Sequence, residues 1–131
     1  VMAELKPRVL TLLHAARWAG VSVSIDAEEA ARFDINLELF ASLYADPALE
    51  GWEGLGFVLQ AYQKRALATV HWLASLARSS GRRMPLRLVK GAYWDSEIKH
   101  AQEAGLVSYP VFTRKTHTDI SYLACVEAIF S

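Results

Sequence analysis

Polar side chains stand at or near the ends of three apolar runs in this sequence. Asp26 ends the first run, Gln60 lies in the second, and Arg87 and Lys90 lie in the third. Charged and amide groups at such positions are costly to bury unless they have partners. Because functional groups gather at the carboxyl ends of parallel strands, this pattern favours a ligand-binding site over a purely structural role.

The alternation within each run predicts which of these side chains share a face. In residues 21–26 the apolar side chains occupy the odd positions, so Asp26 lies on the opposite face with two serines. In the third run the two leucines at 86 and 88 face the helices, which turns Arg87 inward. Gln60 falls on the face of Val58 and Tyr62. The inward-facing set is therefore Asp26, Gln60 and Arg87, whereas Lys90 points inward only if its strand is bulged or ends before it.

The remaining chemically versatile residues give weaker signals. Tyr93 and Trp94 follow the third run directly and are suited to wall a flat cofactor. The four histidines lack the spacing of paired metal ligands, so no metal site is expected. The glycines at 54 and 56 do not complete a dinucleotide-binding fingerprint. Cys125 is the only cysteine, which excludes an internal disulfide, and its place in an apolar helical pattern predicts a small core residue.

Composition places the chain among ordinary globular proteins. Of its 131 residues, 53% are hydrophobic and 21% charged, and 14 basic residues balance 14 acidic ones. This balance excludes the strong basic field that nucleic-acid binding requires, and the three arginines within residues 78–83 are interpreted as a solvated helix end. No apolar run approaches the roughly 20 residues of a membrane-spanning helix. The chain begins and stops inside helical patterns, so we expect a segment of something longer.

Helical and strand-like patterns alternate along the chain. We expect strands at residues 21–26, 57–62 and 86–90. Helical spacing of apolar residues precedes Gly20, continues from Ile35 to about residue 46, and returns before Gly81. A short helix capped by Asp95 or Ser96 is expected to end at Gly105. A last helix is expected with Thr116 or Thr118 as its cap and one apolar face made by Ile120, Leu123, Ala124 and Ile129.

This alternation is typical of parallel βα units in an α/β protein. An open doubly wound sheet and part of a (βα)8 barrel both fit the pattern. A complete barrel needs about 250 residues, so this chain supplies less than half of one.

Four blocks of sequence resemble one enzyme family. Residues 87–99 (RLVKGAYWDSEIK) are similar to the signature of proline dehydrogenases of the bifunctional proline-utilisation family. So are residues 25–30 (IDAEEA), residues 56–65 (GFVLQAYQKR), and residues 111–115 (VFTRK) with 121–125 (SYLAC). The blocks occur in the family's order and cover most of the chain from residue 21 onward, so together they are highly specific.

The resemblance implies a fold and an activity. Residues 1–131 would be a segment of an FAD-binding, distorted (βα)8 barrel, from the helix after strand 2 through the helix after strand 5. Family members oxidise L-proline to Δ1-pyrroline-5-carboxylate by hydride transfer to flavin N5 and pass the electrons to a membrane quinone. A Δ1-pyrroline-5-carboxylate dehydrogenase domain would follow in the same chain, and the protein would be cytoplasmic and peripheral at the bacterial inner membrane.

The same resemblance implies roles for individual residues. Asp26 and Arg87 would belong to the catalytic centre, with Arg87 at flavin N5 and Asp26 balancing its charge. The other residues would contact FAD, and the last four of them would lie along its ribityl and diphosphate side: Ala27, Gln60, Lys90, Gly91 and Ala92, and then Trp94, Thr113, Lys115 and Thr116.

Two alternatives remain open at this point. In a class I aldolase-like barrel, Lys90 at a strand end would form a Schiff base with a carbonyl substrate. A non-catalytic fragment is the second alternative, because the chain lacks the family's remaining strands and the paired arginines that bind the carboxylate of proline. Activity of these 131 residues alone is not expected.

Overall fold

Three parallel strands form the only sheet of the protein in a computed structural model that describes all 131 residues. β1 (Val23–Ile25) and β3 (Leu86–Val89) flank the central β2 (Leu55–Gln60). Both pairings are parallel, which confirms the predicted βα units. The two outer strands are shorter than predicted, since β1 pairs with β2 only from Val23 to Ile25 and β3 ends at Val89. The central strand has the predicted length but begins and ends two residues earlier than expected.

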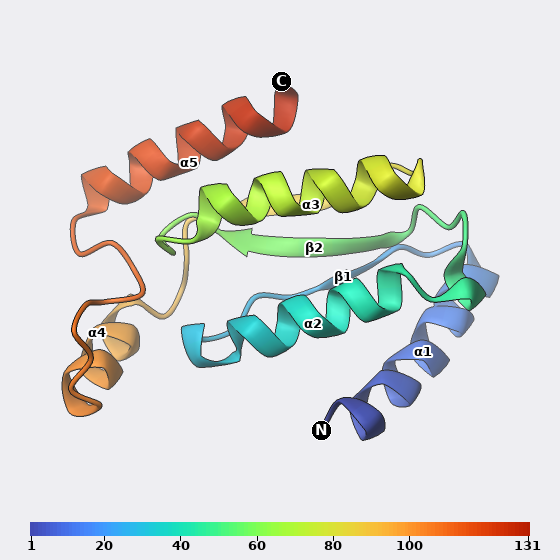
Figure 1. Cartoon of the computed structure of the whole chain (residues 1–131), viewed down its shortest axis with the longest axis horizontal. Coiled ribbons are helices and arrows are strands. Elements are labelled where there is room, and N and C mark those ends of the chain that lie inside the picture. The colour runs from blue at the N-terminus through green and yellow to red at the C-terminus, as the bar shows by residue number, and fades with distance from the viewer.

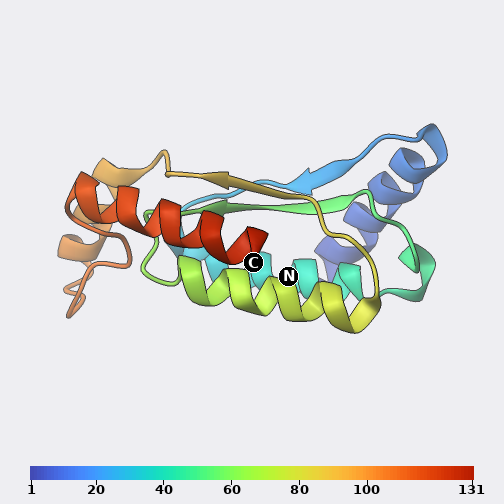
Figure 2. The same ribbon diagram turned by 90° about the horizontal axis from the view of Figure 1, so that it is seen from above.

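Five α-helices accompany the sheet: α1 (Met2–Ala19), α2 (Phe33–Tyr44), α3 (Ala66–Ser80), α4 (Trp94–Glu103) and α5 (Lys115–Phe130). Two short 3-10 helices, η1 (Ala30–Arg32) and η2 (Pro47–Leu49), precede α2 and β2. Gly20 and Gly81 end α1 and α3 with positive φ angles of 70° and 67°, a conformation that favours glycine. Helices α2 and α3 lie on one side of the sheet, with α5 beside α3 (Figures 1 and 2).

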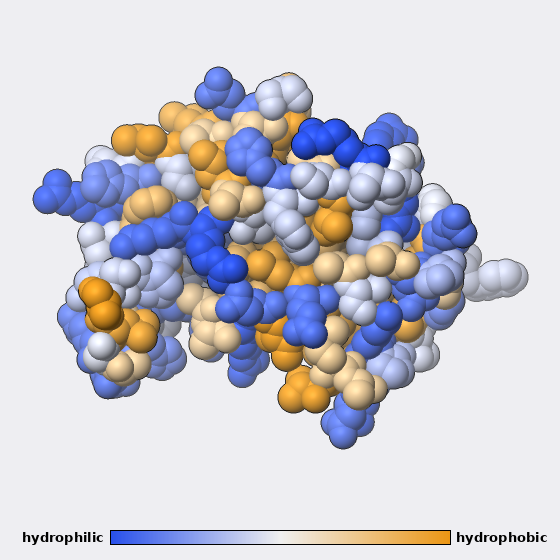
Figure 3. Space-filling view, viewed as in Figure 1, coloured by the Kyte–Doolittle hydropathy of each residue, from blue (hydrophilic) through white to orange (hydrophobic).

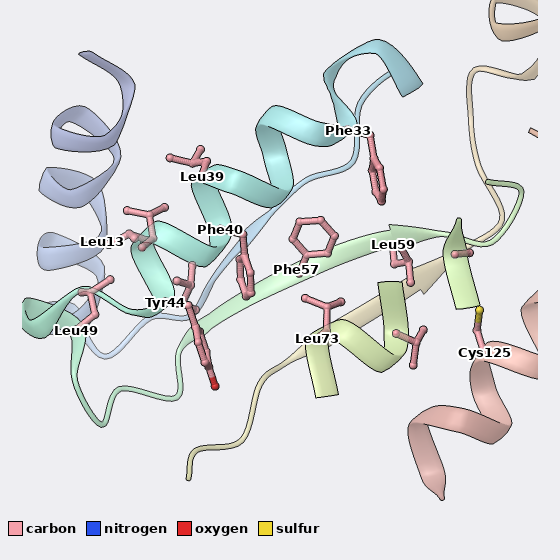
Figure 4. Close-up of a cluster of buried hydrophobic side chains, with 14 residues drawn as sticks. Leu13, Phe33, Leu39, Phe40, Tyr44, Leu49, Phe57, Leu59, Leu73 and Cys125 are labelled. Carbon is pink, nitrogen blue, oxygen red and sulfur yellow. The ribbon is translucent and has the colours of Figure 1, made fainter. Parts of the chain in front are cut away.

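The core lies between the sheet and these helices. Phe40 of α2 is fully buried, with its ring 5.1 Å from that of Phe57 in β2 and 5.5 Å from that of Tyr44 (Figure 4). The helix-facing residues of all three strands join this cluster, as the alternation predicted: Val23, Ile25, Leu55, Phe57, Leu59, Leu86 and Leu88. Cys125 is fully buried in the same cluster, which confirms its predicted core position.

The last helix differs from the sequence prediction. Ile120 and Leu123 were expected on a buried apolar face, but 65% and 67% of their surfaces are exposed. Thr118 and Cys125 are buried instead, because α5 packs against α3 and β3 on only one side.

The expected helix caps were also wrong. Arg114 occupies the N-cap position of α5 and Tyr93 that of α4, and neither side chain caps its helix. Helix α4 therefore starts at Trp94, ahead of both proposed caps. The Ser96 hydroxyl donates to the Tyr93 carbonyl oxygen at 3.0 Å instead of accepting a hydrogen bond from the first turn.

Arg82 corrects the interpretation of residues 78–83 as a purely solvated helix end. Its side chain is buried, and its guanidinium stacks 3.7 Å from the ring centroid of Tyr44. It donates hydrogen bonds to the backbone carbonyl oxygens of Leu49, Trp52 and Tyr44. The Arg82 guanidinium thereby supplies hydrogen-bond donors to backbone carbonyl groups in the segment that leads into β2. This segment lies at the end of the sheet opposite the polar strand ends.

We predict that Arg82→Met destabilises the full-length protein carrying these residues by about 2–4 kcal/mol, since three carbonyl groups lose their donor in a buried setting. Chemical denaturation would measure the change. Arg83→Met is the matched control, because the Arg83 side chain is 93% exposed and should leave the free energy of unfolding nearly unchanged. Equal effects of the two substitutions would contradict the role of Arg82.

The 131-residue chain made alone should associate. Both outer strands have a free edge, and hydrophobic surface gathers over α5 (Figure 3). Exposed apolar patches and open strand edges promote self-association. Sedimentation velocity should therefore show oligomers that grow with concentration. A monodisperse monomer that unfolds cooperatively would be the opposite result.

Candidate active site

The geometric centre of the candidate site is an ion pair between Asp26 and Arg87. Oδ1 of Asp26 lies 3.0 Å from an Nη atom of Arg87 and also accepts the N–H of Ala27 at 2.9 Å. Asp26 directly follows β1, and Arg87 projects from β3 on the face away from the helices. Val58, which pairs with Arg87, belongs to the strand between them. The two residues thus meet across the central strand, as the alternation predicted.

The ion pair opens onto a cavity of about 390 Å³. Gln60 and Arg87 contribute to its walls together with Asp26, which confirms that the predicted inward-facing set converges. Ala27 lies on one side of this cavity, and the turn after β3 lies on the other. That turn consists of Lys90, Gly91, Ala92 and Tyr93.

Gln60 is available mainly as a hydrogen-bond donor. Its side chain is only 3% exposed, and its Oε1 accepts a hydrogen bond from Nε2 of Gln63 at 3.0 Å. Because the oxygen already has a partner, the amide N–H groups remain for a ligand in the cavity.

A second cavity, of about 440 Å³, lies beside the first and shares Lys90 and Gly91 with it. Its other lining residues are Tyr62, Trp94, Thr113, Lys115 and Thr118. Three of the four residues assigned to the ribityl and diphosphate side therefore line this second cavity. Thr116 is exposed and does not line it, whereas Thr118 does.

Lys90 forms an ion pair that sequence reasoning missed. β3 ends at Val89, before Lys90, so the strand alternation does not set the direction of this side chain. Lys90 borders both cavities, and its Nζ lies 2.6 Å from Oδ1 of Asp119 on α5. The hydrogen bond from Lys90 holds the pKa of the Asp119 carboxyl below its usual value. A Schiff-base lysine needs its Nζ free to reach a carbonyl carbon, whereas Nζ of Lys90 is held by Asp119, so the arrangement does not favour the aldolase-like alternative.

Trp94 is anchored to the segment that precedes α5. Its indole Nε1 donates to the carbonyl oxygen of Phe112 at 2.9 Å, while 42% of the residue stays exposed. The Phe112 N–H in turn donates to the Tyr62 carbonyl oxygen at 2.8 Å. Through these two bonds, Trp94 at the second cavity is held in position relative to the segment after β2.

Gly91 is required by packing within the chain. Its φ angle is 138°, and a Cβ atom added there would lie 2.5 Å from ring atoms of Tyr62. The family resemblance had implied that this glycine contacts FAD. The structure shows that the ring of Tyr62 occupies the space that a side chain would take.

Tyr62 itself is an unexpected feature of the site. The residue is 3% exposed, and its hydroxyl has no hydrogen-bond partner. Burial raises the pKa of Tyr62 to about 12, the nearby backbone of Tyr93 lowers it in part, and the negative charge of Glu97 adds to the rise. The aromatic character of residue 62 was visible in the sequence, but its position under the turn at Gly91 was not.

The structure holds no group of three or more His, Cys, Asp or Glu side chains placed to bind a metal ion. None of its helices combines the length and apolar character needed to span a bilayer.

Comparison with known proteins identifies the family. The family model described as proline dehydrogenase matches residues 1–131. The chain belongs to the proline dehydrogenase family. It is 53% identical over all 131 residues to the bifunctional protein PutA of Escherichia coli, and 52% identical over 128 residues to that of Rhizobium meliloti.

Solved structures of the same family share the fold. Proline utilization A of Bradyrhizobium japonicum, determined as a mutant, matches 95% of the chain with a TM-score of 0.92 and 52% identity. The Bdellovibrio bacteriovorus protein, inactivated by N-propargylglycine, matches 96% with a TM-score of 0.93 and 32% identity. The chain spans 10% of the length of the curated relatives and 13% of these solved chains.

We predict that Tyr62→Phe leaves the free energy of unfolding at neutral pH within about 1 kcal/mol of its original value or raises it, because the hydroxyl removed has no partner. In the folded state the hydroxyl stays neutral to about pH 12, whereas in the unfolded chain it ionises near pH 10. Stability should therefore fall between these two pH values, and Tyr62→Phe should remove that contribution.

Tyr44→Phe is the control for this prediction. The Tyr44 hydroxyl accepts from Ser80 at 3.1 Å and donates to the Arg82 carbonyl oxygen at 3.4 Å, so its loss should cost about 1 kcal/mol. Denaturant titrations from pH 7 to pH 11 would measure both variants. A larger loss for Tyr62→Phe than for Tyr44→Phe would show that the Tyr62 hydroxyl has a partner after all.

Proposed function

We propose that these residues form part of an FAD-dependent enzyme that oxidises L-proline to Δ1-pyrroline-5-carboxylate. The observation that carries this proposal is the convergence of Asp26, Gln60 and Arg87 on one cavity. That cavity adjoins a second, lysine-containing cavity at Lys90 and Gly91. Membership of the proline dehydrogenase family supplies the reaction class.

The proposed architecture is a (βα)8 barrel in which β1, β2 and β3 are strands 3, 4 and 5. The parallel order of the strands supports this, as does the free edge on each outer strand, because a barrel pairs every edge. The polar groups also lie at the carboxyl ends of the strands, where barrel enzymes place their active sites. Residues 1–131 would then be a segment of the FAD-binding domain of a longer chain.

The residues present fit FAD in size and in chemistry. Two adjoining cavities suit an elongated ligand with a flat ring at one end and a charged chain at the other. Gln60 presents amide donors and Arg87 a guanidinium to the ring side, and Ala27 and Ala92 give that side small walls. When bound, FAD supplies a hydride acceptor at flavin N5 for the ring carbon next to the proline nitrogen.

The second cavity is suited to the ribityl and diphosphate part. Lys90 and Lys115 bring positive charge to it, and Trp94 and Thr113 line it. Lys115 is also the first residue of α5, and the backbone N–H groups of Lys115 and Thr116 have no backbone acceptor. Free N–H groups at the start of a helix stabilise a nearby anion, which gives Thr116 a role through its backbone.

Arg87 and Asp26 have distinct roles in this proposal. A guanidinium at the ring side offsets negative charge that develops as a hydride arrives, which stabilises the transition state more than the ground state. Asp26 holds that guanidinium by the 3.0 Å ion pair and balances its charge. We assign Asp26 a role in orienting Arg87 and no proton-abstracting role; its bonds to Arg87 and to the Ala27 N–H both go to Oδ1.

The proposed partners lie outside the described residues. The relatives are named bifunctional proteins, which supports a second domain in the same chain, a Δ1-pyrroline-5-carboxylate dehydrogenase. We propose a membrane quinone as the electron acceptor, reached from the cytoplasm by peripheral association with the inner membrane. The balanced charge of this segment gives no support for a nucleic-acid partner.

The decisive test of the function is Arg87→Met in the full-length protein. Methionine retains much of the apolar stem but removes the charge and every donor. The activation free energy for reduction of bound flavin by proline should rise by about 2–4 kcal/mol, which is the effect of deleting one preorganised donor. The flavin reduction potential should also fall, because the electron-rich reduced form loses its cationic neighbour.

Stopped-flow absorbance and potentiometric titration would measure the two effects. FAD content should stay near normal, because Gln60, the turn after β3 and the second cavity are unchanged. Arg83→Met, at the opposite end of β3, is the matched control and should alter neither quantity. An unchanged reduction rate with an unchanged potential for Arg87→Met would refute the proposed mechanism.

A further inference from the structure

Glu97 is a buried acid with no role in the chemistry proposed above. It lies on α4, is 4% exposed, and is the only buried carboxylate in the chain. A charge removed from water is costly unless a specific partner stabilises it. The position of Glu97 therefore calls for a partner that explains its burial.

That partner is the backbone of a distant loop. Oε1 of Glu97 accepts the N–H of Ala30 at 2.7 Å, a contact between residues 67 positions apart. Ala30 is the first residue of η1, whose N-cap residue, Glu29, makes no side-chain hydrogen bond. Glu97 thus supplies from another helix the acceptor that the start of η1 lacks, in a short, charge-assisted bond.

The bond fixes the loop that carries the candidate catalytic carboxylate. At one end of this loop, Asp26 is held by β1 and by its bonds to Arg87 and to the Ala27 N–H. At the other end, Ala30 is held by Glu97. Only residues 27–29 lie between these two fixed points, and η1 continues directly into α2.

Helix α4 lines the second cavity directly and acts on the first one through this loop. Trp94, the first residue of α4, lines the second cavity, and its indole is anchored to Phe112. Glu97 follows three residues later and holds the loop that borders the first cavity. A shift of α4 would therefore displace Asp26 and Ala27 relative to Arg87.

We propose that Glu97 is a positioning residue, which sets the location of Asp26 and Ala27 through its hydrogen bond to the Ala30 N–H. It contacts neither substrate nor cofactor. Its effect on turnover rests on the function proposed above, whereas its effect on the loop does not. The required property is a hydrogen-bond acceptor at the end of the side chain, with negative charge adding strength.

The test compares Glu97→Ala, Glu97→Gln and Glu103→Ala in the full-length protein. Glutamine keeps an acceptor oxygen at the same reach, and alanine removes it. Glu103 is an exposed acid on the same helix, paired with Lys99 at 3.9 Å, and serves as the matched control. The first readout is hydrogen exchange of the peptide that contains Ala30, which needs no activity.

For Glu97→Ala we expect exchange at Ala30 to accelerate by roughly 10- to 100-fold, the loss of one hydrogen bond to a charged group. Flavin reduction by proline should slow by about 10- to 100-fold, as expected when a catalytic group is displaced slightly from its productive position. Bound FAD should remain near its original level. Glu97→Gln should restore most of both properties, and Glu103→Ala should change neither.

Unchanged exchange at Ala30 in Glu97→Ala would overturn the proposal, and so would equal losses in the alanine and glutamine variants. If Glu97→Ala fails to fold, Glu97→Gln decides alone: protected Ala30 with a near-normal reduction rate supports the proposal, and loss of protection overturns it. Faster exchange at Ala30 with no flavin reduction in any variant, the unsubstituted protein included, would uphold the loop contact while refuting the proposed function.

Discussion

The register of β2 against its two neighbours is the constraint on which the rest of this structure depends. It pairs Ser24 with Gly56 and Val58 with Arg87, so the side chains of paired residues on neighbouring strands point to the same face of the sheet. A slip by one residue would move every apolar side chain of a strand out of the core. Gly56 permits this close pairing, because a Cβ atom there would lie 2.7 Å from the Pro85 carbonyl oxygen.

As a result, polar side chains make different kinds of contact at the two ends of the sheet. At the amino end, Arg82 satisfies loop carbonyl groups and stabilises the fold. At the carboxyl end, polar bonds connect segments that are distant in sequence: Asp26 to Arg87, Lys90 to Asp119, Trp94 to Phe112 and Glu97 to Ala30. These bonds hold the loops at this end in fixed positions, and, because most of them are exposed, they contribute little to global stability.

Solvent exposure limits what these residues do by themselves. The side chains of Asp26 and Arg87 are 75% and 61% exposed. In water an ion pair of this kind contributes little, whereas the same charges act strongly on a ligand once water is excluded. The proposed chemistry therefore needs walls from outside these residues, in agreement with the small share of the relatives' length that the chain spans.

The sequence by itself determined the periodic features of this protein. Alternating side chains fixed which residues of each strand face the helices, and hence that Asp26, Gln60 and Arg87 meet. Two glycines marked helix ends, and the ordered motif blocks indicated the family. These features are local, because the side-chain period of a strand and the backbone freedom of glycine act within a few residues.

Only the tertiary structure decided which distant residues meet. Nothing in the sequence pattern pairs Lys90 with Asp119 or Glu97 with Ala30, because these contacts arise from the packing of separate elements. Packing also decided which face of α5 is buried, against the apparent apolar pattern of Ile120 and Leu123. A helix buries the side that its neighbours cover, and no local pattern records where those neighbours lie.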